Sequence, residues 1–389
     1  HRDLHSFPTR RSSDLKMLEY FSVIGIGQCG GRLAKYFEES KLKTSYFNFD
    51  AVDAKDIEGK KFDAKTGEGN KLILDGKGTG RSLKKGFSLI EKGGNQIRKF
   101  LESVTSPDKI VLLVGGLGGG TFSSSVQFFV EELIDMGRKV GVIATLPTSQ
   151  VSGGIRTREN AYTVLKSIRN EDISFFILAD NEQLSKKFEI NPFVDGWTKI
   201  NKEIVKNFLA IENLVQDKPT GIGIGSVDFN EVLSVLVKGG FTSVFSEKLW
   251  FKDISSPDFN VNEFFKKHEL ASGFDYRLSE TFVVSMVVSK IELPRYIHEF
   301  IDKVLNKFNR YSSEGFFGTF YRDTVEPSLE IHILANSMPL PGIVEKRIAN
   351  LNRDKERAKD KGKKSKEKTD KAFAGIKTKN EKAKNDFDF

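Results

Sequence analysis

The stretch VGGLGGGTFSSS, Val114–Ser125, places five glycines in six consecutive positions and then changes to hydroxyl side chains. It follows the apolar run Ile110–Val114, which predicts a buried strand. Ordering glycine is entropically costly, so such a cluster indicates that something approaches the backbone closely. Because backbone N–H groups at a helix N-terminus attract anions, the stretch predicts a loop that holds the phosphates of a nucleotide.

Two more glycine clusters support that interpretation. GIGQCGG, Gly25–Gly31, follows a second apolar run, and GKGTGR, Gly76–Arg81, lies in a polar loop. One cluster alone would favour a simple tight turn, whereas three that can reach one sheet edge favour a nucleotide site. The sequence contains no GxxxxGK[ST] motif, so a lysine-based phosphate loop is excluded.

Strand and helix patterns alternate through the first half of the chain. We expect helices over Gly30–Glu39, from about Ser123, and over Gly154–Ile168. The predicted strands are Phe21–Ile26, Thr44–Phe49, Ile110–Val114, Val140–Ala144 and Ile173–Leu178. This alternation predicts an α/β fold with a parallel sheet covered on both faces, which binds its ligand at the carboxyl ends of the strands.

Composition excludes several classes of protein. Cys29 is the only cysteine of 389 residues, so no intramolecular disulfide can form and a reducing, cytoplasmic compartment is expected. No apolar run approaches the ~18 residues of a membrane span. Beyond residue 16 the histidines are only His268, His298 and His332, too scattered to suggest a metal site or a catalytic triad.

The net charge of +8 is concentrated at the chain ends. Residues 343–389 hold 16 Lys and Arg against 9 Asp and Glu, residues 1–16 hold 4 against 2, and 41 against 42 remain for the body. We expect residues 1–16 to be non-native or disordered, with the protein starting at Met17. The basic tail is either a solvated extension or an electrostatic contact for nucleic acid or an acidic partner.

A long amphipathic helix is predicted over 195–217, because apolar residues recur there at spacings of three and four. Asn201 lies near the apolar stripe, and pattern alone allows either a solvent-edge or a ligand-binding role. Farther on, Asp228 and Glu231 stand three apart at the start of another helix. Acidic residues in a first turn complement the helix dipole, so this pair alone would not indicate a catalytic site.

The order of these motifs resembles the tubulin/FtsZ superfamily of GTPases, from about residue 20 to 235. The matching segments are GQCG at 27–30, NFDA at 48–51, GTGR at 78–81, GGGTFS at 118–123 and VDFNE at 227–231, the last resembling the synergy loop that follows the central helix. The resemblance implies GTP or GDP as ligand, with Mg²⁺ near Gln28 and Asp50. It assigns to the nucleotide Gly27, Gln28, Cys29, Gly30, Asn48, Asp50, Gly78, Thr79, Gly80, Arg81, Gly118, Gly119, Gly120, Thr121, Phe122, Ser123, Arg156, Asn181 and Asn201. Asn181 is matched to the guanine-reading position, with Asp180 as an alternative.

The sequence also departs from the family pattern. Phe122 and Ser124 stand where glycine is usual, and a phenylalanine requires ordinary backbone angles, so the phosphate loop should differ slightly. Ser226 replaces an asparagine before Val227, and Ser152 replaces the usual ribose-binding glutamate. How the ribose is held is therefore open.

The resemblance implies catalysis shared between subunits. Phosphoryl transfer needs positioning and charge neutralisation, yet no residue of the predicted site is suited to orient water. In the family that group comes from the synergy loop of the next subunit, here Asp228 and Glu231. A head-to-tail contact that does not close on itself generates a filament.

The domain organisation expected from these patterns has five parts: 1–16, a GTP-binding domain at 17–194, the central helix at 195–217, a smaller mixed-sheet domain at 218–342, and a C-terminal helix with a basic tail at 343–389. Strands are predicted over Thr281–Val288 and Leu329–Leu334, with a helix over Pro294–Asn309 between them. We expect the aromatic stretches Phe241–Phe251 and Phe316–Phe320 to form core and longitudinal contact surface.

Ile343, Val344, Ile348 and Leu351 predict a C-terminal helix that docks on the body, and a basic extension follows. This arrangement resembles the TubZ branch and implies plasmid or phage DNA segregation through a DNA-bound adaptor. Two alternatives stay open. One is an FtsZ-like division protein whose tail contacts anionic lipid. The other is an NAD(P)-dependent oxidoreductase, since Gly25–Gly30 imitates the Rossmann fingerprint and Asp50 could bind the ribose.

Overall fold

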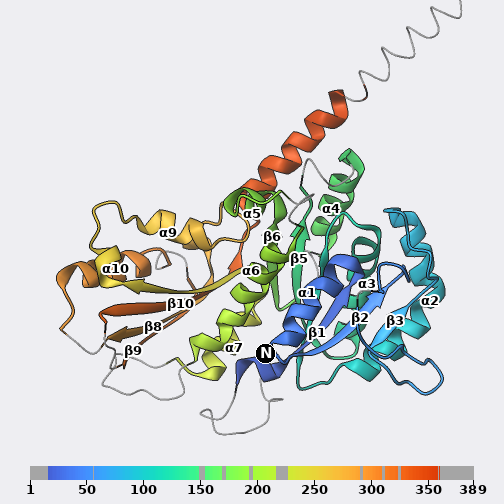
Figure 1. Cartoon of the computed structure of the whole chain (residues 1–389), viewed down its shortest axis with the longest axis horizontal. Helices are drawn as coiled ribbons and strands as arrows, with labels where there is room; N and C mark the ends of the chain where they lie inside the picture. Colours follow the sequence, from blue (N-terminus) through green and yellow to red (C-terminus); the bar gives the residue numbers. More distant parts are fainter. Residues whose placement is uncertain are drawn as a thin grey trace, which may run out of the picture. The chain divides into compact units, whose positions relative to one another are not determined.

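A ten-stranded sheet, ordered β3-β2-β1-β4-β5-β6-β7-β10-β8-β9, runs through the computed structural model (Figure 1). The structure describes residues 16–55, 57–148, 154–168, 172–191, 196–215, 227–289, 292–308, 312–322, 326–357 and 359. The chain forms two units, one ending at Ile343 and one starting at Val344, and the sheet belongs to the first.

The sheet is parallel over its first half. The strands there are β1 (Phe21–Ile26), β2 (Lys43–Asn48), β3 (Lys71–Ile73), β4 (Ile110–Gly116), β5 (Lys139–Leu146) and β6 (Phe175–Asp180). β1 lies between β2 and β4, with Ile26 opposite Phe47 on one side and Gly115 on the other. The five predicted strands are therefore confirmed, and their buried apolar runs explain why helices cover both faces.

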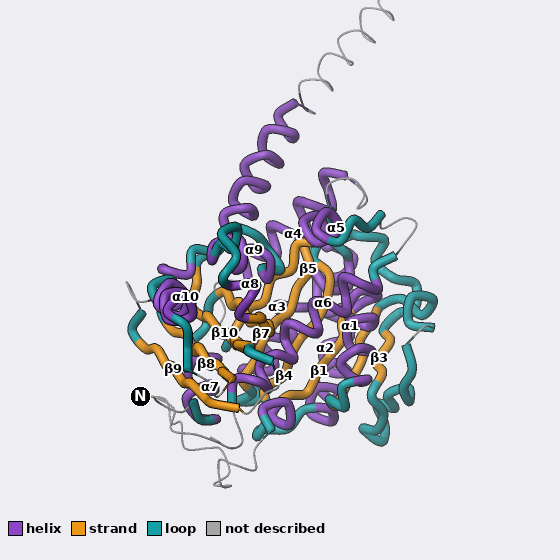
Figure 2. Tube along the Cα trace, turned by 60° about the vertical axis from the view of Figure 1, so that its left-hand side comes forward, coloured by secondary structure: helices purple, strands orange, loops and turns teal. Residues whose placement is uncertain are grey.

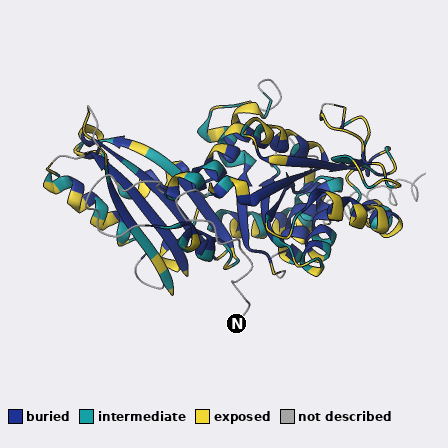
Figure 3. Ribbon diagram, turned by 90° about the horizontal axis from the view of Figure 1, so that it is seen from below, coloured by how far each residue is buried: buried dark blue, intermediate teal, exposed yellow. Residues whose placement is uncertain are grey.

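The second half of the sheet mixes parallel and antiparallel pairs. Its strands are β7 (Phe241–Trp250), β8 (Thr281–Ser289), β9 (Glu314–Arg322) and β10 (Ser328–Met338). β10 is antiparallel to β7 and β8, while β8 is parallel to β9. β7 joins the first half beside β6 through the pair Phe176 and Phe241. The aromatic stretches Phe241–Phe251 and Phe316–Phe320 thus lie mainly in strands β7 and β9. Figure 3 shows that much of this sheet is buried.

Helices flank the strands (Figure 2). They are α1 (Gly27–Glu39), α2 (Leu83–Val104), α3 (Gly120–Asp135), α4 (Gly154–Ile168), α5 (Asn181–Lys187), α6 (Thr198–Leu209), α7 (Phe229–Leu236), α8 (Phe251–Ile254), α9 (Val261–His268) and α10 (Arg295–Leu305), with 3₁₀ turns η2 (Met17–Tyr20), η3 (Ala210–Leu214) and η4 (Tyr276–Leu278). α6 packs on α1 and on β7, between the two halves of the sheet (Figure 1). No helix within the described ranges is long and apolar enough to cross a membrane.

Several predicted helix boundaries were wrong. The helix predicted over Pro294–Asn309 is α10, which ends at Leu305. α1 and α3 begin three residues earlier than expected, at Gly27 and Gly120, because the glycine loops themselves form the first helical turns. The continuous central helix predicted over 195–217 is instead α6 followed by η3, since the backbone tightens to 3₁₀ geometry at Ala210. In the second unit, residues 344–357 are helical as predicted, whereas the tail beyond 359 lies outside the described residues. Docking of that helix stays a prediction.

Because Gly25 and Gly30 have no side chains, α1 lies close to the sheet. A Cβ at Gly30 would lie 2.2 Å from the carbonyl oxygen of Val114 in β4, and one at Gly25 would lie 2.6 Å from the carbonyl oxygen of Gly30. Because those neighbours are backbone atoms, they cannot move aside cheaply. The two glycines therefore fix how near the start of α1 lies to β4.

Gly30→Ala should destabilise the fold by about 1–3 kcal/mol, the usual range for overpacking a close contact. The matched control is Gly94→Ala in α2, where the new Cβ would lie 3.5 Å from Phe128 Cζ, an ordinary contact. That control should stabilise the protein by about 0.5–1 kcal/mol, because alanine loses less backbone entropy in a helix. Urea denaturation measures both changes. Equal stability of the two variants would contradict the packing account.

Candidate functional site

A cavity of about 460 Å³ lies where β1 and β4 end and α1 and α3 begin. It is lined by Ile26, Gly27, Gln28, Cys29, Arg32, Asp50, Asp53, Gly78, Thr79, Gly80, Arg81, Gly116, Leu117, Gly118, Gly119, Gly120, Thr121, Phe122, Thr145, Pro147, Thr157, Asn181, Trp197 and Asn201. The structure thus brings the three glycine clusters together at the carboxyl edge of the parallel strands, which is where sheets of this kind hold ligands.

The N-termini of α1 and α3 meet inside this cavity. A Cβ at Gly27 would lie only 3.2 Å from Thr121 Cβ. Gly27 and Gly118 have left-handed φ values of +71° and +88°, which only glycine adopts cheaply. Neither helix has a side-chain cap, and α6, α8 and α10 lack one as well, whereas α2, α5, α7 and α9 are capped by Ser82, Asp180, Asp228 and Asn260. The first-turn N–H groups of α1 and α3 are therefore suited to an anion.

The third glycine cluster closes over the start of α3. A Cβ at Gly120 would lie only 1.7 Å from Thr79 Oγ1. Gly78, Gly80 and Arg81 all have positive φ, and the Arg81 carbonyl accepts a hydrogen bond from Asn160 Nδ2 at 3.0 Å. The loop thus contributes Thr79 and Arg81 to the lining of the cavity.

Asn48 organises the loop after β2 from outside the cavity. Its Oδ1 accepts from the Asp50 N–H at 3.1 Å and from Thr121 Oγ1 at 3.3 Å, so it links this loop to α3. Asp50 Oδ1 in turn accepts from the N–H groups of Val52 and Asp53. Gln28 Nε2 donates to Asp53 Oδ1 at 3.2 Å. These contacts leave Asp50 Oδ2 and Gln28 Oε1 as oxygen donors for a cation.

Two asparagines line the cavity on other elements. Asn181 is the first residue of α5, and its buried Oδ1 has no hydrogen-bond partner within the described residues. Asn201 lies on α6 and is buried, one turn after the indole of Trp197. Asp180, the alternative candidate for contacting guanine, does not line the cavity. Its carboxylate instead caps α5 by accepting from the N–H groups of Glu182 and Gln183. The geometry therefore favours Asn181 over Asp180.

Four predicted nucleotide residues do not line the cavity. Gly30 serves the packing of α1 on β4, Asn48 supports the loops, and Ser123 Oγ accepts from the Gly118 N–H at 2.9 Å. Arg156 is exposed, and its neighbour Thr157 lines the cavity instead. Three of the four thus lie behind the loops that form the wall.

The departures from the family pattern have local explanations. The ring of Phe122 lies over Gly115, where a Cβ would be 1.9 Å from Phe122 Cδ2, so the phenylalanine fills space beneath an α-helical first turn. Ser124 Oγ donates to the Gly120 carbonyl at 2.7 Å and lies against Gly86 of α2. Ser152 and Ser226 lie outside the described residues.

The predicted catalytic carboxylates lie elsewhere in the chain. Asp228 caps α7, accepting from the Glu231 N–H at 2.9 Å, and Glu231 accepts from the Asp228 N–H at 2.8 Å. This capping box is the helix-dipole role that pattern alone allowed. It uses one oxygen of each carboxylate and leaves the other oxygen for an incoming group. Neither residue lines the cavity of its own chain.

Sequence reasoning missed several lining residues, notably Arg32, Asp53, Thr145, Thr157 and Trp197. Arg32 lies in the second turn of α1, four residues after Gln28, and this helical spacing was a signal that the sequence offered. Thr145 near the end of β5 could be inferred only from its register opposite Gly116 of β4. Among the described residues, no group of three or more His, Cys, Asp and Glu side chains could hold a metal ion by itself.

Cys29 lies in the first turn of α1, on the cavity wall. Its sulfur lies 3.6 Å from Thr145 Oγ1. Burial raises the pKa of the Cys29 thiol, and the Thr145 hydrogen bond and the nearby Arg32 charge offset this only in part. The residue is therefore expected to be a weak nucleophile.

Comparisons with known proteins agree with this geometry. Residues 21–189 match the Tubulin/FtsZ family, GTPase domain. The chain is similar to tubulin-like protein TubZ of Bacillus cereus, 25% identical over 236 residues, 58% of this chain and 54% of the relative. Cell division protein FtsZ 1 of Pyrococcus horikoshii is 26% identical over 222 residues, 57% of this chain and 56% of that one. The matches thus span about half the length of these relatives.

The fold is similar to that of a GTPγS-form protofilament of TubZ from Bacillus thuringiensis serovar israelensis. The TM-score is 0.70 at 17% identity, covering 91% of this chain and 96% of the solved one. The structural match therefore extends over the second half of the sheet as well.

Cys29 should react with iodoacetamide more slowly than a free cysteine at pH 7.5, because its raised pKa lowers the thiolate fraction. The rate should rise as pH increases through and above 9. GDP at saturating concentration should slow the reaction further by covering the cavity wall. Mass spectrometry follows this single cysteine. Labelling at the rate of the urea-unfolded chain, unaffected by GDP, would contradict the placement of Cys29.

Proposed function

We propose that this chain, whose residues 21–189 match the GTPase domain of the Tubulin/FtsZ family, binds GTP, assembles head to tail and hydrolyses GTP at the contacts between subunits. The observation that carries the proposal is the pairing of two uncapped helix N-termini, α1 and α3, with a pair of asparagines in one cavity. The oxidoreductase alternative loses support, because the α3 loop would have no role in it.

The triphosphate is assigned to the glycine-rich end. There the first-turn N–H groups of α1 and α3 supply hydrogen bonds, while Thr79 and Thr121 add hydroxyl groups. Positive charge comes from Arg32 and Arg81, both on the cavity wall. Together these groups can supply the electrostatic contribution that phosphoryl transfer requires.

The guanine base is assigned to the other end. The side-chain amides of Asn181 and Asn201 can both donate and accept, so they can match the edge of guanine. The unpartnered Oδ1 of Asn181 would gain a hydrogen bond from a base N–H group. The Trp197 indole, one turn before Asn201, can stack on the face of the base.

Mg²⁺ fits this cavity as a partner of the phosphates. It usually binds through one or two protein oxygens together with phosphate oxygens and water, so no larger ligand cluster is required. Asp50 Oδ2 and Gln28 Oε1 are the oxygens that the hydrogen bonds described above leave available. The ion would neutralise phosphate charge there.

Water activation is assigned to Asp228 and Glu231 of a neighbouring subunit. Both side chains are half-buried at the N-terminus of α7, held in the capping box, and absent from the lining of their own cavity. A direct role in hydrolysis therefore requires the α7 start of one molecule to reach the phosphates of another. This arrangement makes hydrolysis depend on assembly.

Glu231→Gln should lower GTP turnover about 10²-fold or more while filaments persist in sedimentation assays with GTP. Glutamine retains the capping box, so a fall in turnover reports loss of the carboxylate and not of helix α7. A second chain with Asn181→Ala and Asn201→Ala keeps Glu231 but loses its base contacts. Mixing the two inactive chains should restore turnover at mixed contacts, since one supplies the cavity and the other the carboxylates. Absence of any recovery, with both chains folded and co-sedimenting, would contradict catalysis in trans.

For the cellular role we propose DNA segregation of the TubZ kind, in which the basic tail engages a DNA-bound adaptor. Its support is the similarity to TubZ and the charge of residues 343–389, 16 basic against 9 acidic. The FtsZ-like division role is the second candidate, because the FtsZ 1 relatives match as well as TubZ does.

Removing residues 353–389 should leave GTP-dependent sedimentation unchanged and abolish retention on adaptor-coated DNA in a salt-dependent way. Vesicles of phosphatidylglycerol distinguish the second candidate. Tail-dependent binding to these vesicles at about 150 mM salt, without retention on adaptor-coated DNA, would favour the division role instead.

A further inference from the structure

A bend of the chain after α9 contacts the helix that presents Asn181 to the cavity. The bend comprises residues 269–273, and we name it the α9 bend. It is bonded to the residue just before Asn181, because the Asp180 N–H donates to the Leu270 carbonyl at 2.7 Å. Asp180 is the last residue of β6 and caps α5, so this bond lies where the chain passes from the strand to the helix.

The α9 bend also holds α5 through a side chain. Gln183 Oε1 accepts a hydrogen bond from the Ser272 N–H at 2.5 Å. The Gln183 N–H belongs to the cap of α5, since it donates to Asp180 Oδ1 at 3.3 Å. Asn181 therefore lies between two residues that are both bonded to the α9 bend. A shift of the bend would move the first turn of α5 and the Asn181 side chain with it.

The Asn181 amide depends on this support for its orientation. Its Oδ1 is buried and has no hydrogen-bond partner within the described residues. The Asn181 carbonyl accepts from Ser185 Oγ at 2.6 Å, which ties the backbone of the first turn to the next turn of the same helix. The position of the first turn of α5 therefore decides where the Oδ1 lies on the cavity wall.

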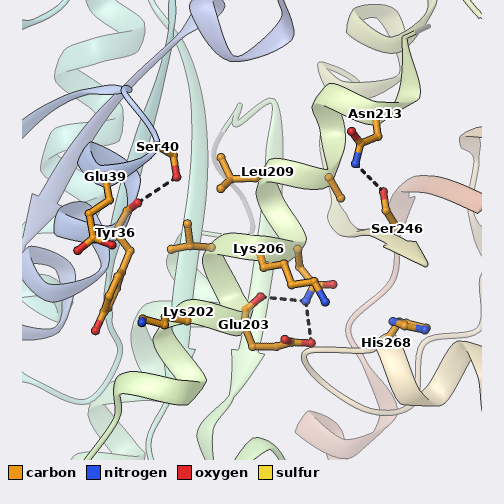
Figure 4. Close-up of a pocket in the computed structure, with 13 residues that line it drawn as sticks. Tyr36, Glu39, Ser40, Lys202, Glu203, Lys206, Leu209, Asn213, Ser246 and His268 are labelled. Carbon is orange, nitrogen blue, oxygen red and sulfur yellow. Dashed lines mark hydrogen bonds between the residues drawn. The ribbon is translucent and has the colours of Figure 1, made fainter. Parts of the chain in front are cut away.

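His268 seats the start of the α9 bend on the second half of the sheet. This last residue of α9 is buried, and its ring stacks on Phe245 of β7 with 4.7 Å between the centroids. Figure 4 shows His268 on the same side of α6 as Ser246 of β7. The bend thus starts from a packed position beside β7.

The far end of the α9 bend is closed by hydrogen bonds. The buried Glu269 side chain accepts from the Gly273 N–H at 3.0 Å through its Oε2. Gly273 has a left-handed φ of +94°, and its carbonyl accepts from the Gly342 N–H at 3.0 Å. The Ser272 carbonyl accepts from the Ile343 N–H at 3.3 Å. With both ends held, the bend is a fixed support for α5.

We propose that the α9 bend positions Asn181 against the guanine base, and that Gln183 is the positioning residue through which it does so. This inference rests on the proposed function, in which Asn181 contacts the base. Gln183 is not among the described residues that line the cavity. Its contribution to nucleotide binding therefore acts through Asn181, and not through a contact of its own.

A double-mutant cycle tests this role. Calorimetric titration of GDP into the full chain gives the affinity of wild type, Gln183→Met, Asn181→Ala and the double variant. Gln183→Met keeps the length and helix propensity of the side chain but loses the acceptor for the Ser272 N–H, so GDP binding should weaken about fivefold to tenfold. In the Asn181→Ala background the same change should cost less than about twofold, because no amide is left to position.

Two further variants separate positioning from general damage to α5. Gln183→Glu retains an acceptor for the Ser272 N–H and should bind GDP within about twofold of wild type. Lys186→Gln removes the exposed ion pair with Glu182, 3.1 Å long on the same helix, and should leave GDP affinity unchanged. Thermal unfolding checks that every variant is folded.

The possible failures are distinguishable. Wild-type protein that bound no GDP, or bound ADP as tightly as GDP, would overturn the proposed function and this inference together. Wild-type protein that prefers GDP leaves the proposed function standing. In that case three results would each overturn the positioning role alone: undiminished affinity in Gln183→Met, an equal loss in both backgrounds, or a Gln183→Glu variant as weak as Gln183→Met.

Discussion

Two helix N-termini that point into one cavity without side-chain caps are the constraint on which the rest of this structure depends. Each leaves N–H groups that must find an acceptor, and α1 and α3 present theirs together at the ends of β1 and β4. The close approach requires glycine at 25 and 30 beneath α1 and at 115 beneath the Phe122 ring. The glycines between Gly115 and Gly120 are therefore explained by close packing, and they leave an edge suited to an anion.

Much of the first half of the fold could be predicted from sequence, because apolar strands and glycine loops are local signals. β1 and β4 were located within two residues, and most of the residues assigned to GTP line one cavity. What failed depended on tertiary contacts. Helix orientation decides whether Ser123 faces a ligand or the Gly118 N–H. It also decides whether Arg156 or Thr157 lines the cavity wall. The 22-residue α2 was missed, because Gly86 and Gly93 weaken its helix pattern. Those glycines are required by tertiary contacts, since Ser124 and Leu74 lie against them.

The end of the cavity that Asn181 lines is hydrogen-bonded to the segment between α9 and β8. The Asp180 N–H donates to the Leu270 carbonyl at 2.7 Å, and Gln183 accepts from the Ser272 N–H. Farther along, Asn336 of β10 donates to the carbonyls of Val235 and Leu236, which end α7. Helix α5, which begins at Asn181, is therefore linked to the segment after α9, and α7, which Asp228 caps, is linked to β10. On the proposed function, a nucleotide at Asn181 and a neighbouring subunit at α7 would both act on the second half of the sheet.

The central claim is that the cavity of one molecule and the α7 carboxylates of another form one active site. GTP turnover per subunit, measured against protein concentration with GTP and Mg²⁺ in excess, tests it most directly. The account predicts negligible turnover below a threshold concentration and a steep rise above it, where subunits meet. A turnover number that stays constant down to concentrations at which the chain is monomeric would contradict it.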